Sequence, residues 1–365
     1  MSVSVLTGDQ FGAVPKAEPT ISEPVRQKNR TRGGDAPRPA AQQMTSTDEE
    51  LVARSADGDI DSFNQLVIRW ERPIYALAYR VIGREEEARD VVQEAFLRWH
   101  RGPGTARSDE AWLVSVTTRI SIDRLRRAAT ERAAYAGQWL PEPLPTPPPD
   151  RDAEVADDLS LAFLFLLERL GPDERAAFLL HEVFGAGYED IARTLGKSEA
   201  ACRQIVHRAK ERVRHDRRRF VAPPDVRRTV ATRFADALRR EDRDEVLALL
   251  ADDALLVADG GGRMPALGEV QQGAERIAQL LVGFERMGRI QLERRGSVVL
   301  EHEVAWLNGD PAILTLLGGR ILFATVLQLD GERIAGLFRV MNPAKLTTLG
   351  RPTVLGPEQT LQDIL

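Results

Sequence analysis

Residues 187–213 read GYEDIARTLGKSEAACRQIVHRAKERV, and this stretch decides the fold of the middle of the chain. Its pattern predicts a short helix over 188–195, a turn at Gly196 and a second helix that Ser198 caps. Two helices joined by so short a turn are typical of a helix-turn-helix. The residues expected between the two helices are Ile191, Ala192, Cys202 and Ile205.

The second of these helices is basic in an acidic chain. Residues 193–219 hold ten Arg or Lys against three Asp or Glu, whereas the whole chain has 50 basic and 55 acidic residues. Arginine and glutamine suit base edges in the major groove of DNA, and the other cations suit phosphates. The side chains outside the expected core are Arg203, Gln204, His207, Arg208 and Lys210. They predict a DNA-reading surface; the alternative is a basic amphipathic helix that only packs.

The length and composition of the chain limit its class. At 365 residues it is long enough for two or three domains. It has no run of eighteen apolar residues, no signal-peptide pattern at its start and a single cysteine, Cys202. We therefore expect a cytoplasmic protein with no membrane partner. The net charge of −5 excludes a protein that coats DNA by bulk electrostatics, so any nucleic-acid role needs local basic patches.

Composition shifts divide the first part of the chain. Residues 1–48 are rich in Gly, Pro, Ser and charge and are expected to be disordered. Apolar residues recur at three- and four-residue steps in 49–134 and in 157–221, which predicts two all-α domains. Residues 135–156 lie between them and carry six prolines, which predicts a stiff linker without helix.

A third domain is predicted over 222–347, with 348–365 as a tail. Helical patches at its start are followed by the strand-like runs SVVLE, VAWL, AILTLL, RILFATVLQL and RIAGLFRVM. Helices first and antiparallel strands afterwards are typical of a separate α+β domain.

Residues 111–128, AWLVSVTTRISIDRLRRA, predict a helix with a second nucleic-acid surface. The apolar stripe is Leu113, Val116 and Ile120, and the residues expected to point elsewhere are Ser115, Thr118 and Arg119. Asp123 is placed to pair with Arg127, which leaves Arg124 and Arg126 free for phosphates. Trp112, beside the loop RGPGTARSD, offers unpaired bases a stacking surface near a cationic track. The alternative is a core tryptophan under a solvated basic face.

In their order and spacing these segments resemble the extracytoplasmic-function (ECF) sigma factors of bacterial RNA polymerase, over about residues 49–215. The run ARDVVQEAFLRW (88–99) resembles the helix of sigma region 2 that docks on the clamp helices of the polymerase β′ subunit. The resemblance implies that the core-polymerase surface includes Asp90, Gln93, Glu94 and Phe96. It also implies that region 4, over 157–221, contacts the β flap of core RNA polymerase.

The same resemblance assigns promoter DNA contacts. For the −10 element, which region 2 opens and reads, they are Trp112, Arg119, Asp123, Arg124, Arg126 and Arg127. For the −35 element, which the helix-turn-helix reads, they are Ser198, Glu199, Arg203, Gln204, His207 and Arg208. Arg119 stands where many members have Asn, and Ala201 where many have Thr. At these two positions the contacts with the −10 and −35 elements are therefore expected to differ from those that many members make.

Residues 225–346 resemble SnoaL-like domains, which are cone-shaped α+β folds with a pocket between a curved sheet and its helices. One subset of ECF sigma factors carries such a domain, and three motifs typical of the subset occur here: WLPEP (139–143), DGGGR (259–263) and NPAKL (342–346). The residues that this resemblance assigns to a regulatory inter-domain contact are Trp139, Leu140, Pro141, Asp259, Gly260, Gly261, Gly262, Arg263, Asn342, Pro343, Lys345 and Leu346.

Each motif also has a local interpretation. Prolines hold Trp139 and Leu140 extended, ready to dock on the third domain. Three glycines permit positive φ, so Asp259 and Arg263 are expected to flank a flexible loop, with a plain β-turn as the alternative. Residues 342–346 predict a turn that clips back the last strand, or its simple termination.

Together these patterns predict two all-α sigma domains and a C-terminal α+β domain. The predicted function is that of a sigma factor that binds core RNA polymerase, recognises both promoter elements and promotes melting, with modulation by the fused domain. We expect no catalytic residues, metal or cofactor, because all four tyrosines lie upstream of the third domain and His302 is its only histidine. A small-molecule ligand of this domain stays open. The alternatives are a helix-turn-helix regulator with a ligand-binding domain that acts without polymerase, and an enzyme with a DNA-binding appendage.

Overall fold

The computed structural model describes residues 47–102, 108–133, 135–148, 159–214, 222–293 and 300–356. Most of the expected disordered extension, the centre of the loop before α4, the end of the linker and the end of the tail lie outside these residues. The extension was expected to include Asp48, but a helix begins there. Thr47 caps it, accepting a hydrogen bond from Glu50 N at 3.3 Å in a capping box.

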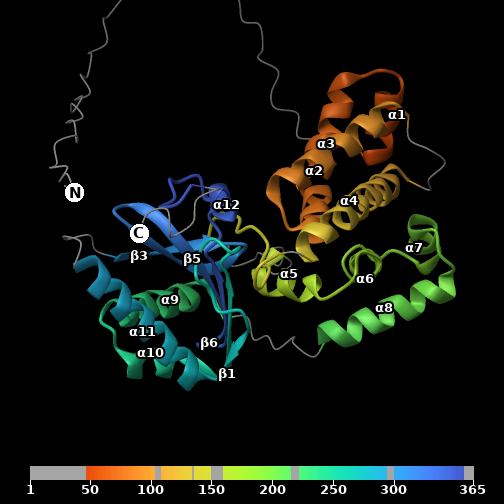
Figure 1. Ribbon diagram of the computed structural model, residues 1–365. Helices are drawn as coiled ribbons and strands as arrows, with labels where there is room; N and C mark the ends of the chain where they lie inside the picture. The colour runs from red at the N-terminus through yellow and green to blue at the C-terminus, as the bar shows by residue number, and fades with distance from the viewer. Residues whose placement is uncertain are drawn as a thin grey trace, which may run out of the picture. The chain divides into compact units, whose positions relative to one another are not determined.

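The first helical unit is the group of helices drawn in orange and gold in Figure 1, and its buried apolar residues belong to one core. Its helices are α1 (Asp48–Ala56), α2 (Ile60–Ile82), α3 (Glu85–His100) and α4 (Asp109–Ala133). Asp59 caps α2 by accepting hydrogen bonds from Asp61 N and Ser62 N, and Gly83 ends it with φ +75°. The buried centre includes Leu66, Leu77, Trp99 and Leu113.

The second helical unit begins with a helix that is apolar on every side. Its helices are α5 (Leu161–Glu168), α6 (Pro172–Glu182), α7 (Tyr188–Leu195) and α8 (Glu199–Arg214). Phe163, Leu164 and Leu167 of α5 join the core of the first unit, while Leu161 and Ala162 join a different core. A helix that is apolar all round must be covered all round. Among the described residues, no helix is both long and apolar enough to cross a membrane.

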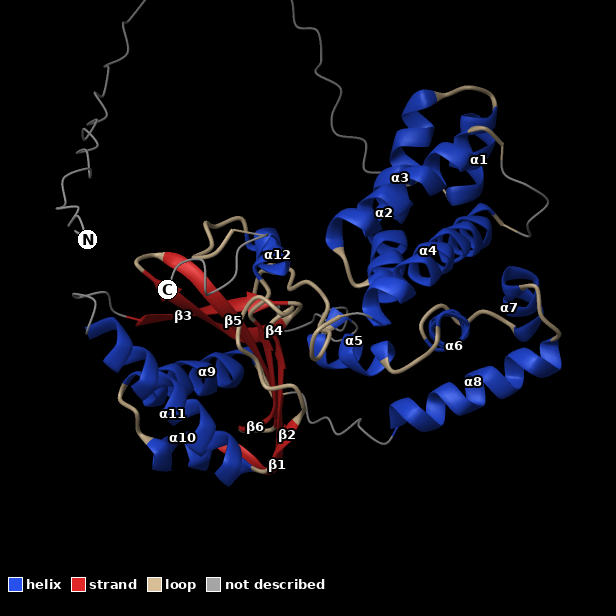
Figure 2. Cartoon of the chain, viewed as in Figure 1, coloured by secondary structure: helices blue, strands red, loops and turns tan. Residues whose placement is uncertain are grey.

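The C-terminal domain is a sheet that carries the helices of residues 224–293 on one face (Figure 2). Its elements are α9 (Pro224–Arg239), α10 (Arg243–Leu249), β1 (Leu250–Asp259), β2 (Gln271–Gln272), α11 (Ala274–Glu293), β3 (Leu300–Leu307), β4 (Asp310–Leu317), β5 (Arg320–Asp330), β6 (Arg333–Val340), α12 (Pro343–Leu346) and the 3-10 turn η2 (Thr347–Leu349). The strand order is β2-β1-β6-β5-β4-β3. The predicted antiparallel pairing is confirmed for β3 to β6, whereas β1, which was not predicted as a strand, runs parallel to β6.

The two faces of this sheet have different partners. Successive residues of β6 alternate between them: Leu337 packs with α9 and α11, and Phe338 faces the opposite core. That opposite core contains Leu140 of the linker together with Leu161 and Ala162 of α5. Because both faces are covered, the central strands read as nearly continuous apolar runs. The sheet is therefore buried partly by the linker and by the first helix of the second helical unit.

Candidate nucleic-acid interface

The helix-turn-helix has the bounds expected from its sequence. α7 ends where Gly196 adopts φ +65°, and the Ser198 hydroxyl accepts a hydrogen bond from Ala201 N at 3.3 Å in the first turn of α8. The cluster between the two helices is Ile191, Cys202, Ile205 and Val206, with Ala192 packed against it. Burial of these residues fixes the two helices against each other, so α8 presents one constant outer face.

That outer face carries the side chains predicted to contact duplex DNA. Those that are exposed on α8 are Glu199, Arg203, Gln204, His207 and Arg208. Arg203 pairs with Glu199 at 3.0 Å and lies over the ring of Tyr188, with its guanidinium carbon 5.3 Å from the ring centroid. Exposed pairs of this kind contribute only about 0–1 kcal/mol. Phosphates therefore compete easily for these cations.

A polar patch on α3 is the candidate polymerase surface. Asp90 and Gln93 are exposed, and Glu94 is half-buried. Arg124 of α4 was predicted to be free for phosphate, but its guanidinium lies 3.4 Å from the Asp90 carboxylate and 3.7 Å from that of Glu94. Phe96 is only 7% exposed within the helical core, so its side chain does not extend the accessible patch.

The end of α4 is tied to the second helical unit. Arg126 was also predicted to be free, but it pairs with Asp173 of α6 at 2.6 Å and with Asp123 at 3.4 Å. Asp123 thus pairs with Arg126 instead of the expected Arg127, which is exposed. Asp173 also binds Lys197 at 3.0 Å. Burial alone raises the pKa of the Asp173 carboxyl, but hydrogen bonds from Lys197 and Arg126 bring it below its usual value.

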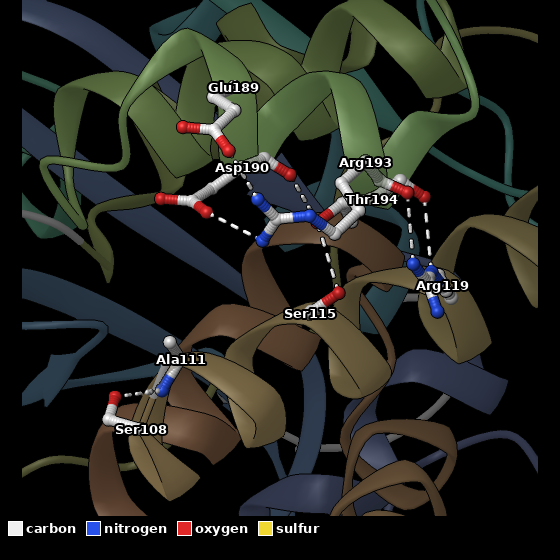
Figure 3. A network of polar contacts seen from close by, with 8 residues as sticks. All are labelled: Ser108, Ala111, Ser115, Arg119, Glu189, Asp190, Arg193 and Thr194. Atoms are coloured by element: carbon white, nitrogen blue, oxygen red, sulfur yellow. Dashed lines mark hydrogen bonds and ion pairs between the residues drawn. The ribbon is translucent and has the colours of Figure 1, made fainter. Parts of the chain in front are cut away.

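The middle of α4 contacts α7 directly (Figure 3). The hydroxyls of Ser115 and Thr194 are 3.0 Å apart, and the Arg119 guanidinium donates to the carbonyls of Thr194 at 3.2 Å and Arg193 at 2.9 Å. The last carbonyls of a helix lack partners within it and carry its negative dipole end. Arg119 therefore acts as a side-chain cap of α7. In this state it is engaged by the helix-turn-helix.

Trp112 is half-buried against the helical core and also borders an open space. A cavity of about 480 Å³ is lined by Trp112, Ser115 and Arg119 on α4, and by Phe184 and Thr194 on the opposite side. The prediction that Thr118 points away from the core was wrong, because it is fully buried and donates to Val114 O. Trp112 thus borders a space that residues of the second helical unit line on the opposite side.

The three motifs of the linker and C-terminal domain meet at one buried ion pair. The carboxylate of Asp259, fully buried at the end of β1, accepts hydrogen bonds from the Lys345 ammonium at 2.7 Å, Leu140 N at 2.8 Å and the Tyr135 hydroxyl at 2.5 Å. The Tyr135 hydroxyl accepts a bond from Asn342 Nδ2 at 2.8 Å. We call Tyr135, Leu140, Asp259, Asn342 and Lys345 the linker lock.

Burial shapes the chemistry of the linker lock. Burial, followed by the negative charge of Asp259, raises the pKa of Tyr135 well above its usual value, so this hydroxyl stays a donor. Lys345 Nζ also lies 3.3 Å from the centroid of the Trp139 ring. Sequence reasoning missed Tyr135, because it lies upstream of the domain that it contacts. Tyr135 and Asp259 lie far apart in the sequence, and no local pattern around either residue indicates that they are in contact.

The glycine motif is a packed turn, so the prediction of a flexible loop was wrong. Arg263 N and Met264 N both donate to Gly260 O. A Cβ on Gly260 would lie 2.2 Å from Met264 O, and one on Gly261, where φ is +59°, would lie 2.3 Å from Asn342 Nδ2. Only glycine fits these two positions. Gly262 follows with φ +71°.

The NPAKL motif is a short helix instead of the predicted turn. Asn342 caps α12 by accepting a hydrogen bond from Ala344 N at 3.1 Å. Pro343 takes the first helical position, where its missing N–H has no cost, and Leu346 is buried beside the sheet. The helix thereby aims Lys345 at Asp259.

The linker also forms hydrogen bonds with the first helical unit. Glu142 accepts a hydrogen bond from Glu85 N at 2.8 Å, which places its carboxylate at the N-terminus of α3. Glu142 N donates to Gly83 O at 3.0 Å, and Pro141 lies against Gly83. Burial raises the pKa of Glu142, and its bond from Glu85 N opposes this. One short segment is therefore bonded to the first helical unit and to the C-terminal domain.

Comparisons with known proteins agree with this architecture. The family model described as Sigma-70 region 2 matches residues 66–131, and the model described as Sigma-70, region 4 matches residues 160–213. The chain is 34% identical over 284 residues to the ECF RNA polymerase sigma factor SigJ of Mycobacterium tuberculosis (strain ATCC 25618 / H37Rv), covering 75% of this chain and 90% of that protein. It is 32% identical over 287 residues to the probable ECF sigma factor SigI of Mycobacterium tuberculosis (strain CDC 1551 / Oshkosh), covering 75% and 91%. A crystal structure of Mycobacterium tuberculosis SigJ matches with a TM-score of 0.60 at 29% identity, covering 77% of this chain and 96% of that one.

Two sigma-70 regions in this order, the second with a helix-turn-helix, define a bacterial transcription initiation factor. The chain belongs to the extracytoplasmic-function sigma factors of RNA polymerase. It therefore serves transcription initiation as a non-enzymatic sigma factor, with a C-terminal helix-plus-sheet domain beyond the two sigma regions.

Proposed function

We propose that this sigma factor rests in a closed state in which α7 occupies part of the −10 surface on α4, and the −35 surface on α8 is held too close to α4 for both promoter elements to be bound. The observation that carries the proposal is the contact of Ser115 and Arg119 with the end of α7. The linker lock and α5 would stabilise this state, since both lie between the sheet of the C-terminal domain and the helical units. Binding of core RNA polymerase would then have to separate α4 from α7.

The dimensions of a promoter support this proposal. Elements named for positions −10 and −35 are about 25 base pairs apart, which is roughly 85 Å along a duplex at 3.4 Å per base pair. α4 has 25 residues, which corresponds to a length of about 37 Å. With Ser115 and Thr194 in contact at 3.0 Å, the two surfaces cannot reach both elements at once.

In the open state each surface would have its own role. Asp90, Gln93 and Glu94 would bind the β′ clamp helices, and region 4 would contact the β flap. Trp112 would stack on an unpaired base of the −10 element, with Arg119 and Arg127 near the phosphates. Melting costs about 1.4 kcal/mol per base-pair step, and stacking a base on an aromatic ring returns roughly 1–3 kcal/mol. Capture of one or two bases is therefore enough to favour opening once polymerase is bound.

The −35 contacts would come from Ser198, which caps α8, and from the outer face of α8, namely Glu199, Arg203, Gln204, His207 and Arg208. The C-terminal domain would modulate the sigma factor by holding the linker, and we assign it no catalytic role. The buried tyrosine–aspartate pair of Tyr135 and Asp259 is enclosed by Lys345 and Leu140, so it is not placed to receive a substrate.

A reversible disulfide tests the closed state. Ser115→Cys with Thr194→Cys places two sulfurs where hydroxyls are now 3.0 Å apart, so a small side-chain rotation brings them to the S–S bond length of about 2.05 Å. The only native cysteine, Cys202, is buried and does not compete. With core polymerase, the oxidised double variant should give no promoter-specific transcript and the reduced form should recover it. Each single-cysteine variant is the control, and equal transcription before and after reduction of the double variant contradicts the proposal.

A second comparison tests the role of the C-terminal domain. The full-length Asp259→Asn/Lys345→Met variant removes the charges of the linker lock, and Glu303→Gln/Arg351→Met removes an exposed pair in the same domain. We expect the first variant alone to change transcript yield, with an unchanged preference for promoter sequence. Equal yield from both variants and the unmodified chain would refute control through the linker.

A further inference from the structure

A cavity of about 280 Å³ lies within the C-terminal domain, on the α11 side of the sheet. Its walls are mostly apolar and include Leu256, Met264, Phe284, Leu322 and Met341. A liquid water occupies about 30 Å³, so the space corresponds to about nine water-sized volumes. An apolar molecule of roughly that many non-hydrogen atoms fits it. None of the promoter or polymerase surfaces described above uses this cavity.

One charged side chain interrupts the apolar wall. Arg339 of β6 borders the cavity and is 5% exposed. Its Nε donates to Thr325 Oγ1 at 3.1 Å, and its guanidinium carbon lies 4.6 Å from the centroid of the Phe323 ring. Within the described ranges, its two terminal nitrogens have no hydrogen-bond acceptor. Burial lowers the pKa of Arg339 to about 10, with Glu285 opposing this, so the side chain is still charged at neutral pH.

The nearest acid already has a partner. Glu285 of α11 also borders the cavity and is 9% exposed. Its carboxylate lies 3.3 Å from His302 Nε2, and His302 Nδ1 lies 3.2 Å from Thr315 Oγ1. The Glu285 side chain is thus held toward β3 by His302. The described residues provide no ion pair that directly satisfies Arg339.

A guanidinium that is mostly buried and has acceptors for only part of its N–H groups is costly, because burial removes most of its hydration. Two parallel N–H groups of arginine match the two oxygens of a carboxylate. An amine would be repelled, and an alcohol would engage only one donor. The cavity is therefore complementary to a molecule that has a planar anionic group for Arg339 and an apolar remainder for the other walls.

We propose that this cavity binds a small monocarboxylate with an apolar body of about eight carbons, the carboxylate accepting hydrogen bonds from Arg339. Binding adds the acceptor that the guanidinium lacks and fills the apolar space with carbon. The site is independent of the closed state proposed above, since the cavity is lined by residues of the C-terminal domain alone.

Octanoate is a probe of suitable size, and its binding to the full-length chain is measured by calorimetry and ligand-observed NMR. We expect saturable binding with a dissociation constant of about 1 mM or below, and at least tenfold weaker binding of 2-octanone and octylamine. Arg339→Gln should weaken octanoate binding at least tenfold. Arg333→Gln is the matched control, since it changes an exposed arginine of the same strand and should leave binding unchanged.

Two further variants keep the proposal testable if Arg339→Gln fails to fold. Glu285→Gln removes the neighbouring negative charge and should tighten octanoate binding severalfold, with no effect on 2-octanone. Ala258 lines the cavity on β1 and lies opposite Arg339 of β6 in the sheet register. Ala258→Leu should therefore abolish binding by filling the cavity while Arg339 is unchanged. No saturation up to about 10 mM octanoate overturns the proposal, as does equal affinity for octanoate and 2-octanone.

Discussion

Removing the ammonium group of the linker lock is the sharpest test of how the C-terminal domain is attached. In the Asp259–Lys345 pair the side chains are 0% and 5% exposed, so Lys345→Met leaves a buried carboxylate with only its bonds from Leu140 N, Gly261 N and the Tyr135 hydroxyl. Breaking a buried pair by removing one partner costs about 3–5 kcal/mol. For a domain of this size we expect a fall in Tm of about 6–20 °C. Calorimetry and urea unfolding of the full-length chain measure it.

An exposed pair in the same domain provides the control. Arg351 and Glu303 are 38% and 48% exposed, so Arg351→Met should cost no more than about 1 kcal/mol. The Asp259→Asn/Lys345→Met variant should lose less than the sum of its single variants, because residues in contact couple by about 0.5–3 kcal/mol. If Lys345→Met costs no more than Arg351→Met, or if the effects of Asp259→Asn and Lys345→Met simply add, the linker lock does not hold the linker.

Three other outcomes follow from the same contacts. Trp112→Ala should impair open-complex formation, followed by permanganate footprinting, more than binding to core polymerase; equal loss of both would make it a packing residue. Burial, followed by the charge of Glu85, raises the pKa of Tyr75 to about 12, so its contribution to stability is complete below pH 10.0 and is lost as the pH rises toward 12. Urea unfolding on both sides of pH 10 should therefore show a smaller alkaline loss for Tyr75→Phe than for the unmodified chain. Arg175→Met should cost about 3–5 kcal/mol in the same unfolding assay, because it leaves Glu168 and two backbone carbonyls without their buried donor; a loss under about 1 kcal/mol would contradict this.

Local patterns made much of the fold predictable. The turn at Gly196 and the cap at Ser198 gave the bounds of α7 and the start of α8, because both signals act within a few residues. The strand β1 was missed. Asp252 and Asp253 are exposed within it, and a register shift between Leu250 and Leu255 interrupts its pairing with β6. Such an irregular strand has no clean alternation to find.

The sequence shows where charged side chains occur, but it did not predict which of them form ion pairs with each other. Arg124 and Arg126 were expected to be free because Asp123 was assigned to Arg127, but α3 and α6 supply carboxylates that pair with them. Likewise, Tyr135 reaches Asp259 across 124 positions of sequence. Periodicity describes one helix at a time, whereas these pairs depend on how separate elements pack.

The position of α5 has a consequence for synthesis of the chain. Its sheet-facing residues, Leu161 and Ala162, are made roughly 180 residues before β6, which is about 9–36 s earlier at 5–20 residues per second. Throughout that interval the sheet that covers this face of α5 is incomplete. A chain released before residue 340 would therefore expose part of the apolar surface of α5 and of the linker that the finished sheet buries.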